Sequence, residues 1–347
     1  MKLTRRHVLD CLLLLFCVQF SFTSAELYSQ ESGLKPSLLS ELWVAKAAEE
    51  TPEITLLMTG DIMMDRYIAT LRERAITDED PGNDLFPFTY MPEVMDAVKT
   101  KLGVDELDLV LGNLECPVTD SDYENNGTAM IFNCKPSVVE QLKNAGFTTF
   151  TLANNHTLDM GKDAPQESHD LLATGGLDSF GHPDTANGAF TFLSYEIDGM
   201  TIGFLGFNDA VIKLDMDTAL QKISEMDPLV DVLIVAVHWG FEYEPTARES
   251  VVNKAHQFVD AGADFIWGHH PHVIQNSEVY NGKTIYYSLG NFVFDQYWSE
   301  ETQEGLVLGL KITPAPNPEE SPILTTVEVI VDLVNLGEPK PRMEGTN

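Results

Sequence analysis

Apolar runs of strand length alternate with amphipathic segments along most of this chain. Short runs rich in Val, Ile, Leu and Phe, bounded by Gly, Asn or Asp, are typical of buried strands. Such runs lie at 53–61, 107–115, 148–156, 231–240, 264–270, 305–313 and 325–334. Segments with helical periodicity or helix-ending glycines lie between them, at 136–147, 165–176 and 246–263. The alternation predicts an α/β protein.

Two further segments have the pattern of β-hairpins. Residues 190–209 form two apolar runs joined by Asp198-Gly199, and residues 277–289 form two runs joined by Asn281-Gly282. Asx-Gly pairs favour tight two-residue turns because both positions tolerate a positive φ. Each segment is therefore predicted to fold as an antiparallel pair.

Five of the predicted strands end in polar side chains. These are Asp61, Glu115, Asn155 with His156, His238, and His270 with His272. In α/β sheets, ligands gather beyond the carboxyl ends of the strands, so these side chains are expected to converge. Carboxylate and amide oxygens with neutral imidazoles suit Mn, Zn, Fe or Mg. We predict a site for one or two divalent ions, held by Asp61, Glu115, Asn155, His238, His270 and His272.

The segment 265–275, FIWGHHPHVIQ, concentrates three of the nine histidines within four positions. If His270, Pro271 and His272 continue as a strand, the two imidazoles point the same way and His269 points the other way. This geometry assigns His270 and His272 as ligands, and gives His269 a structural or supporting role.

Two residues are candidates for direct action on a substrate. His156 follows the candidate ligand Asn155 and has a titration range suited to general acid catalysis. Arg66 has a guanidinium that binds a carboxylate or phosphate with two prongs, or alternatively forms a salt bridge with nearby acids. Trp239, Tyr243 and Asn291 line the site, or the two aromatic residues pack in the core.

The start of the chain has the pattern of an export signal. A basic start precedes an apolar core at 11–20 and a small-residue cleavage site at 23–25. The apolar run is too short to span a bilayer comfortably, which favours a cleaved signal over a membrane anchor. We therefore expect an exported protein, extracellular, periplasmic or associated with the cell envelope. Membrane contact would come only through an uncleaved signal.

The charge of the chain is strongly negative and excludes one class of partner. Lys and Arg number 21 against 54 Asp and Glu, a formal net charge of −33. A nucleic-acid binder needs a basic footprint, so nucleic acid is not expected as a partner. A polyanion would be attracted only by a local positive centre, such as a bound metal.

Cysteine positions predict one disulfide. Cys11 and Cys17 lie in the signal, which leaves Cys116 and Cys134 in the mature chain. A single pair in an exported protein favours a disulfide over two buried thiols.

Six segments resemble, in order, the motifs of the CapA family, which is linked to poly-γ-glutamate capsule synthesis. They are TGDIMMDR (59–66), NLECPVTD (113–120), LANNHTLDMG (152–161), VHWGFEYEP (237–245), GHHPHVIQ (268–275) and YSLGNFVFDQ (287–296). The resemblance implies a calcineurin-like metallophosphoesterase fold: a four-layer α/β/β/α sandwich of two mixed sheets with flanking helices and a metal site at one end. The strands at 305–334 would complete the second sheet.

This resemblance also sets the expected domain boundaries. Residues 1–25 are the signal peptide and 26–51 a linker or loosely docked arm. Residues 52–336 form the CapA-like metallophosphoesterase-fold domain, and 337–347 a flexible tail rich in Pro and Gly.

One departure from the wider superfamily pattern affects the metal site. The superfamily usually begins with Asp-x-His, whereas this chain has Asp61-Ile62-Met63. A thioether is too soft a ligand for Mn, Mg or Fe. Met63 is therefore expected to pack in the core, which would leave one metal position poorly filled.

The resemblance and the residues together give a leading functional hypothesis and two alternatives. The leading one is an exported metal-binding protein, with a hydrolase-like site, in the synthesis, export or hydrolysis of a γ-linked polyglutamate polymer. Its partners would be that anionic polymer or synthase subunits. The first alternative is a non-catalytic accessory or polymer-binding subunit, and the second a phosphoesterase acting on a cell-envelope or nucleotide phosphate. Whether the protein is an enzyme stays open at this point.

Overall fold

The computed structural model describes residues 53–75, 85–124, 130–184, 190–317 and 320–342. The predicted signal and the predicted arm lie outside this part. Within the described residues, none of the helices combines the length and the apolar character needed to cross a bilayer.

The first sheet is mixed and is built around the strand β1 (Ile54–Ile62). Its order is β14-β13-β12-β1-β2-β3-β4, and β11 also pairs with β1. The pairs from β1 to β4 are parallel, whereas β12, β13 and β14 add antiparallel strands on the other side. The other strands are β2 (Leu109–Leu114), β3 (Thr149–Thr151), β4 (Asp178–Phe180), β11 (Asn291–Val293), β12 (Glu304–Thr313), β13 (Ile323–Val334) and β14 (Glu338–Pro341).

The second sheet has the order β5-β6-β7-β8-β10-β9 and is also mixed. Its strands are β5 (Phe192–Ile197), β6 (Met200–Asn208), β7 (Val232–His238), β8 (Phe265–His269), β9 (Ser277–Tyr280) and β10 (Lys283–Tyr286). The pairs β5–β6 and β9–β10 are antiparallel and turn at the two Asx-Gly pairs, so both predicted hairpins are confirmed.

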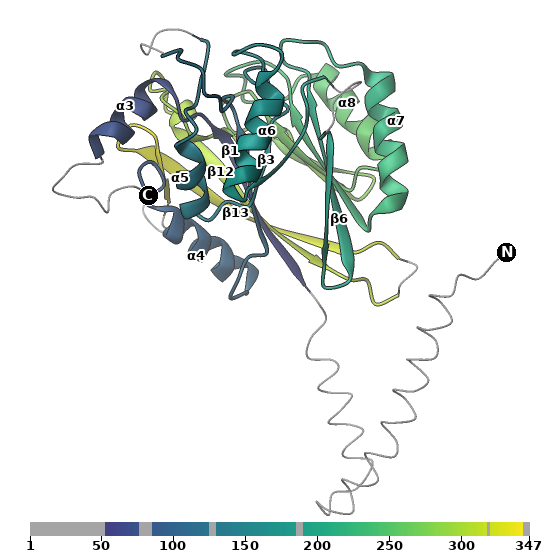
Figure 1. The fold of residues 1–347 in the computed structure, drawn as a ribbon. Coiled ribbons are helices and arrows are strands. Elements are labelled where there is room, and N and C mark those ends of the chain that lie inside the picture. Colours follow the sequence, from purple (N-terminus) through teal and green to yellow (C-terminus); the bar gives the residue numbers. More distant parts are fainter. Residues whose placement is uncertain (1–52, 76–84, 125–129, 185–189, 318–319, 343–347) are drawn as a thin grey trace, which may run out of the picture. The chain divides into compact units, whose positions relative to one another are not determined.

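Helices cover the outer face of each sheet (Figure 1). Those on the first sheet are α4 (Met91–Leu102), α5 (Val138–Asn144) and α6 (Ala164–Gly175), with α3 (Arg66–Ala75) beside them. The second sheet is covered by α7 (Met216–Met226) and α8 (Glu249–Asp260). Two 3-10 turns, η1 (Asp227–Leu229) and η2 (Glu301–Gln303), complete the described elements. The predicted four-layer α/β/β/α sandwich is confirmed.

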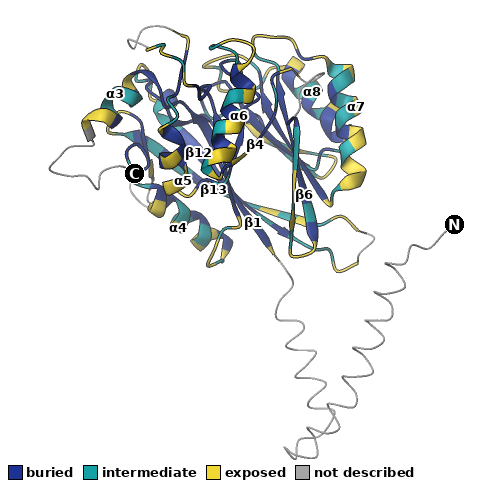
Figure 2. Cartoon of the chain, viewed as in Figure 1, coloured by how far each residue is buried: buried dark blue, intermediate teal, exposed yellow. Residues whose placement is uncertain are grey.

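The strand β7 shows why its sequence is almost continuously apolar. Val232, Ile234 and Ala236 pack between the two sheets, in the same core as residues of β1 and β12. The alternate residues, such as Leu233 and Val235, pack against the helices α7 and α8. Because side chains alternate across a strand, a strand covered on both faces needs apolar residues at every position. Figure 2 shows that the central strands of the sheets are coloured mostly as buried.

The structure corrects two predictions at the end of the chain. The final strands β12 and β13 do not join the sheet of the chain's second half but pair beside β1 in the first sheet. Residues 338–341, expected in a flexible tail from 337, form β14 along β13. A paired strand has its backbone hydrogen bonds satisfied, so residues 338–341 belong to the sheet and not to a flexible tail.

Candidate metal centre

A β-bulge in β1 turns Asp61 toward the space between the sheets. Met58 pairs with Leu111 and Asp61 pairs with Asn113, so β1 has one residue more than β2 over this interval. Leu111 packs between the sheets, and strand alternation places Asn113 on the same face. Without the extra residue, Asp61 would face the helices. The bulge therefore sets the direction of this carboxylate.

The residue Gly60 lies within this bulge because the chain passes close to it. A side chain at position 60 would place its Cβ 2.0 Å from the carbonyl oxygen of Gly290. The amide of Asp61 donates to that same oxygen at 3.0 Å. Glycine is required here by contact between two backbones.

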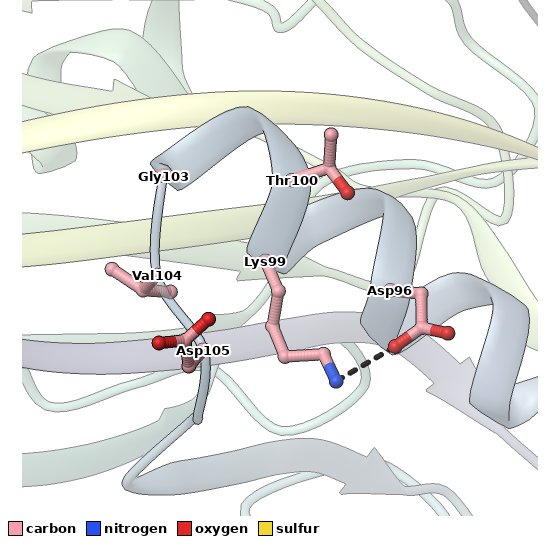
Figure 3. Close-up of a pocket in the computed structure, with 6 residues that line it drawn as sticks. All are labelled: Asp96, Lys99, Thr100, Gly103, Val104 and Asp105. Atoms are coloured by element: carbon pink, nitrogen blue, oxygen red, sulfur yellow. Dashed lines mark ion pairs between the residues drawn. The ribbon is translucent and has the colours of Figure 1, made fainter.

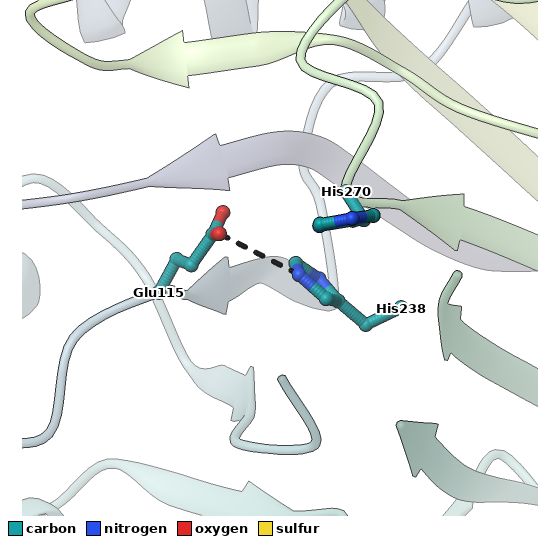
Figure 4. Close-up of side chains that lie close together, drawn as sticks. All are labelled: Glu115, His238 and His270. Atoms are coloured by element: carbon teal, nitrogen blue, oxygen red, sulfur yellow. Dashed lines mark ion pairs between the residues drawn. The ribbon is translucent and has the colours of Figure 1, made fainter. Parts of the chain in front are cut away.

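Glu115 is the central carboxylate of the site. It follows β2 directly and is completely buried. Its Oε1 lies 3.5 Å from His238 Nε2, 3.7 Å from His272 Nε2 and 4.0 Å from His156 Nε2. Within the described part of the chain, neither carboxylate oxygen has a hydrogen-bond donor. Figure 4 shows Glu115 facing His238 and His270.

The disulfide Cys116–Cys134 follows Glu115 immediately, as predicted from the cysteine count. The residue before Cys134 makes a further contact near the site: the amide of Asn133 donates to Asp65 Oδ2 at 2.9 Å. The disulfide thus joins the segment after β2 to the segment that precedes α5, beside the central carboxylate.

The histidines of the 265–275 segment do not continue as a strand. The strand β8 ends at His269, and His270 and His272 have left-handed φ values of 96° and 57°. The prediction that an extended strand through Pro271 aligns these two imidazoles is therefore wrong in its geometry. Both side chains still reach the centre: ligand atoms of His270 lie within 4.8 Å of those of Glu115 and His238, and His272 Nε2 lies 3.7 Å from Glu115 Oε1.

His269 has a more direct contact than its position in the motif indicated. It shares the inward face of β8 with Phe265 and Trp267, which pack between the sheets. Its Nδ1 lies 3.0 Å from Asp61 Oδ1. The prediction that it points away from the site is wrong, while its contact with a ligand candidate fits the supporting role.

The remaining predicted ligands lie in the same cluster. His272 Nδ1 is 3.0 Å from Asn291 Oδ1 and 3.3 Å from Asp61 Oδ2, and its Nε2 is directed at Glu115. Asn155 Oδ1 lies 2.8 Å from His238 Nε2. The structure thus brings together all six residues that the sequence nominated as ligands.

Burial sets the protonation states of these groups. Burial alone would raise the pKa of Asp61, but hydrogen bonds with His269 and His272 hold it well below the usual range. Burial, with the charge of Asp61, raises the pKa of Glu115 well above its usual range. Burial and a neighbouring imidazole lower the pKa of His238 well below its usual range and that of His270 to about 3. His238 and His270 are therefore neutral at pH 7, the form that ligates metals.

His156 lies at the edge of the cluster and is held firmly. Its Nδ1 is 2.7 Å from Asp159 Oδ2, and its ring stacks on Phe132 with centroids 3.9 Å apart. These contacts direct Nε2 toward Glu115. A carboxylate on one ring nitrogen orients an imidazole so that the other nitrogen faces the reacting group.

Arg66 does not fit the predicted role of holding a substrate anion. Its Nε donates to Asp295 Oδ2 at 3.1 Å and its terminal nitrogen pairs with Asp295 Oδ1, with both side chains buried. Both prongs of the guanidinium are thus engaged, and the salt-bridge alternative is the one that the structure supports. Met63 packs in the core and its Sδ accepts the amide of Asp65 at 3.1 Å, as expected of a residue that does not bind metal.

Sequence reasoning missed several residues that shape the centre. Asn113 donates to Asp61 at 2.9 Å, and Asp159 orients His156. Glu242 has a carboxylate within 4.8 Å of ligand atoms of His270 and His272. Glu242 follows the end of β7 by four residues, and this position beyond a strand end could have identified it in the sequence as a ligand candidate. Trp239 instead packs in the core against Phe258 and Tyr287.

The donor set fits a divalent metal ion. Ligand atoms of Glu115, His238 and His270 lie within 4.8 Å of one another, and so do those of Asp61, Glu115 and His272. A fully buried carboxylate without a hydrogen-bond donor is costly unless a cation faces it. Glu115 belongs to both groups, so it would help to hold an ion bound by either of them.

A surface hollow elsewhere lacks this chemistry. It has a volume of about 480 Å³ and lies at the C-terminal end of α4 (Figure 3). Its one ammonium, Lys99, is paired with Asp96 at 2.7 Å. The residues around it are Asp96, Lys99, Thr100, Gly103, Val104 and Asp105, none of which belongs to the buried cluster.

The fold and the cluster define an α/β/β/α sandwich protein with a buried cluster of metal-ligating side chains at the carboxyl ends of strands from both sheets. The chain belongs to the family described as "Bacterial capsule synthesis protein PGA_cap", which it matches over residues 55–296. This match confirms the resemblance found in the sequence motifs.

Curated relatives carry related descriptions. The chain is 31% identical to a PGA biosynthesis protein CapA from Bacillus subtilis (strain 168), over 88% of this chain and 77% of the relative. It is 32% identical to a capsule biosynthesis protein CapA from Bacillus anthracis, over 78% and 68% respectively. A probable polyglutamine synthesis accessory protein from Mycobacterium tuberculosis (strain ATCC 25618 / H37Rv) is 24% identical, over 70% and 74%.

Proposed function

We propose that this protein acts on a γ-linked polyglutamate polymer during capsule synthesis, through a divalent metal centre of hydrolase type. The names of its two Bacillus relatives support the polymer and the process. The buried, unpartnered carboxylate of Glu115 within a ring of histidines is the observation that supports the metal. Asp61, Glu115, Asn155, His238, His270 and His272 would hold Mn, Zn, Fe or Mg.

A divalent ion bound there would act as a Lewis acid on the carbonyl oxygen of a γ-glutamyl amide. The protein supplies the rest of the chemistry. Asn291 and Asp61 fix the ring of His272 so that Nε2 faces inward. Asn291 would contact the ligand and not the ion, and a partner of this kind sets the orientation of a ligating imidazole.

His156 is the residue proposed to move a proton. Asp159 holds its Nδ1 and leaves Nε2 directed at the centre. When protonated on Nε2, it donates to the nitrogen of the departing amine, which would otherwise leave as a poor leaving group. Phe132 stacks on the ring and restricts its rotation.

A second candidate function is a non-catalytic accessory subunit that binds polymer or synthase. Met63 stands where the superfamily usually has a histidine ligand, and it is buried in the core, away from ligand chemistry. The Mycobacterium tuberculosis relative named as an accessory protein points in the same direction. Such a subunit would bind the polymer without turnover.

Metal analysis combined with two substrates tests these functions. Purified protein should contain one or two equivalents of a divalent metal, and the metal-loaded form should cleave γ-linked oligoglutamate but not a generic phosphodiester. Binding of the oligomer without cleavage would select the accessory function. Turnover of the phosphodiester alone would select a phosphoesterase, and a metal-free protein that stays so after Mn or Zn addition would refute the metal centre.

We also propose that the chain is exported and cleaved after Ala25, on the basis of its basic start, apolar run and small-residue site. N-terminal sequencing of the secreted protein should begin near Glu26. Folded, exported protein that retains Met1 would instead indicate an anchor.

A further inference from the structure

An aromatic groove lies beside the metal centre. This Trp298 groove has a volume of about 420 Å³ and is lined by Tyr243, Pro245, Val273, Ile274, Trp298, Ser299, Glu301 and Glu304. The ring centroid of Tyr243 lies 6.2 Å from that of His272 and 5.7 Å from that of Trp298. Tyr243 thus connects the groove to the ligand cluster.

The position of Tyr243 is fixed by the backbone. It has a left-handed φ of 64°, which is strained for an aromatic residue, and its amide donates to the carbonyl of Pro271 at 2.8 Å. That hydrogen bond ties Tyr243 to the turn that presents His270 and His272. The turn at 270–272 therefore positions both the Tyr243 wall of the groove and the two histidine ligand candidates.

The groove carries negative charge that is only partly compensated. Glu304 pairs with Arg342 at 2.5 Å, and the nearby Glu244 pairs with Arg248. In the part of the chain that the structure describes, Glu301 in the groove and Glu242 beside the histidines form no ion pair with Lys or Arg. Hydrogen bonds from its own backbone and from Ser299 lower the pKa of Glu301, so it is ionised at neutral pH.

The wall therefore has the chemistry of a cation site. Two exposed aromatic rings, Tyr243 and Trp298, line the groove together with the carboxylate of Glu301. This combination binds ammonium groups by cation–π and ionic attraction. The guanidinium of Arg66 is already neutralised by Asp295. An anionic segment of polymer would find like charge along this groove.

We propose that the Trp298 groove binds the free amino group at the end of the polymer, so that the metal centre acts on the amino-terminal residue. The inference rests on the proposed function. Each internal residue of a γ-linked polyglutamate carries an α-carboxylate, and the amino end is the single ammonium of the chain. It is the one group of such a polymer that complements the groove.

The reaction implied is removal of one terminal glutamate by hydrolysis. Water adds across the terminal γ-amide: its oxygen forms a bond to the carbonyl carbon, the C–N bond breaks, and a proton passes to the leaving nitrogen. That nitrogen becomes the new free amino end. The products are free glutamate and a polymer shorter by one residue, with no other reactant required.

A pair of matched oligomers tests the proposal. Binding of a γ-linked glutamate pentamer to the metal-loaded full chain is compared with binding of the same pentamer acetylated on its amino end. Acetylation should weaken binding about tenfold, because the ionic and cation–π contacts are lost together. The variant Glu301→Gln should weaken binding of the free-amine pentamer about threefold and leave the acetylated one unchanged.

The control variant is Glu300→Gln, which makes the same charge change at an exposed neighbour outside the groove lining. It should leave both affinities unchanged. Equal binding of the two pentamers, or an equal effect of Glu301→Gln on both, would overturn the amino-end proposal while the proposed function stands. If neither pentamer binds, the proposed function fails as well.

Discussion

Glu115 is a buried carboxyl whose charged form is stabilised only when a cation is present. Its carboxylate has no donor among the described residues, and burial raises its pKa. We expect Glu115→Gln to make the metal-free protein more stable by about 1–3 kcal/mol, because at neutral pH the wild type must either bury the charge of this carboxyl or bind a proton as it folds. The same variant should lose most of its metal binding. Thermal unfolding with chelator, and with added Mn or Zn, measures both effects.

The matched control for this variant is Glu140→Gln, which removes a carboxylate at an exposed position of α5. It should alter neither the metal-free stability nor the stabilisation by metal. A metal-free Glu115→Gln protein that is less stable than wild type would show that the carboxylate has a partner within the protein.

At the scale of single residues, the sequence predicted which residues meet but not how they point. The residue types at strand ends were sufficient to nominate all six ligand candidates. Direction depends on backbone torsions that the residue types do not reveal. The left-handed φ values of His270 and His272 are of this kind. So is the end of β8 at His269, which places that side chain on the inward face of the strand.

Partners far apart in the sequence were equally hidden. Asp295 neutralises Arg66 across more than two hundred residues. No local pattern indicates this pairing, so the guanidinium looked available for a substrate.

At the scale of elements, the bulge in β1 is the feature that aims Asp61, and Gly60 permits it. We expect Gly60→Ala to destabilise the protein by about 3 kcal/mol, because its Cβ would collide with the carbonyl of Gly290. The displaced strand end should also weaken metal binding. Denaturant unfolding and metal titration on the same preparation would show this.

Gly282→Ala is the control, since it also substitutes a glycine. It lies in the turn between β9 and β10 with a φ of 79° and open space around its Cβ position. The left-handed backbone strain of an alanine there should lower the free energy of unfolding by about 1 kcal/mol, with no change in metal affinity. Equal effects of the two substitutions on metal binding would argue against a role for the bulge in positioning Asp61.

The disulfide acts on the segment that follows β2. Cys116 adjoins Glu115, and the bond to Cys134 closes a loop with a sequence separation of 18. Replacing both cysteines by Ser should lower the free energy of unfolding by about 3 kcal/mol, since the unfolded chain gains freedom. Metal affinity should fall too, as the segment that holds Glu115 loosens. Two alkylatable thiols in the native wild type would refute the premise.

Element types were predictable where the pattern was strong. Both hairpins and the helices α6 and α8 match the predicted segments closely, because turn residues and amphipathic spacing mark them. The helices α4 and α7 were not identified. The partners of β12 and β13 could not be predicted either, since strand pairing is decided by the packing of distant segments and not by local pattern.

At the scale of the whole molecule, an acidic protein is proposed to bind an acidic polymer. The chain has a net charge of −33, so long-range forces repel the polymer while the metal centre attracts it locally. Salt screens the long-range part most, with a Debye length of about 10 Å at 0.1 M and about 3 Å at 1 M. We therefore expect the affinity of the metal-loaded protein for long poly-γ-glutamate to rise severalfold with salt, opposite to the behaviour of basic polyanion binders.

Chelation separates the two contributions to that affinity. Without metal the centre holds the carboxyl groups of Asp61, Glu115 and Glu242 and, within the described residues, no cation that faces them, so attraction is lost and binding should fall at every salt concentration. The double variant His270→Ala and His272→Ala should behave like chelated protein, with a circular dichroism spectrum like that of wild type. Affinity for the polymer, measured by fluorescence anisotropy from about 0.05 to 0.5 M salt, tests the account. An affinity that falls as salt rises, or that survives both chelation and the double variant, would mean that a basic surface and not the metal centre holds the polymer.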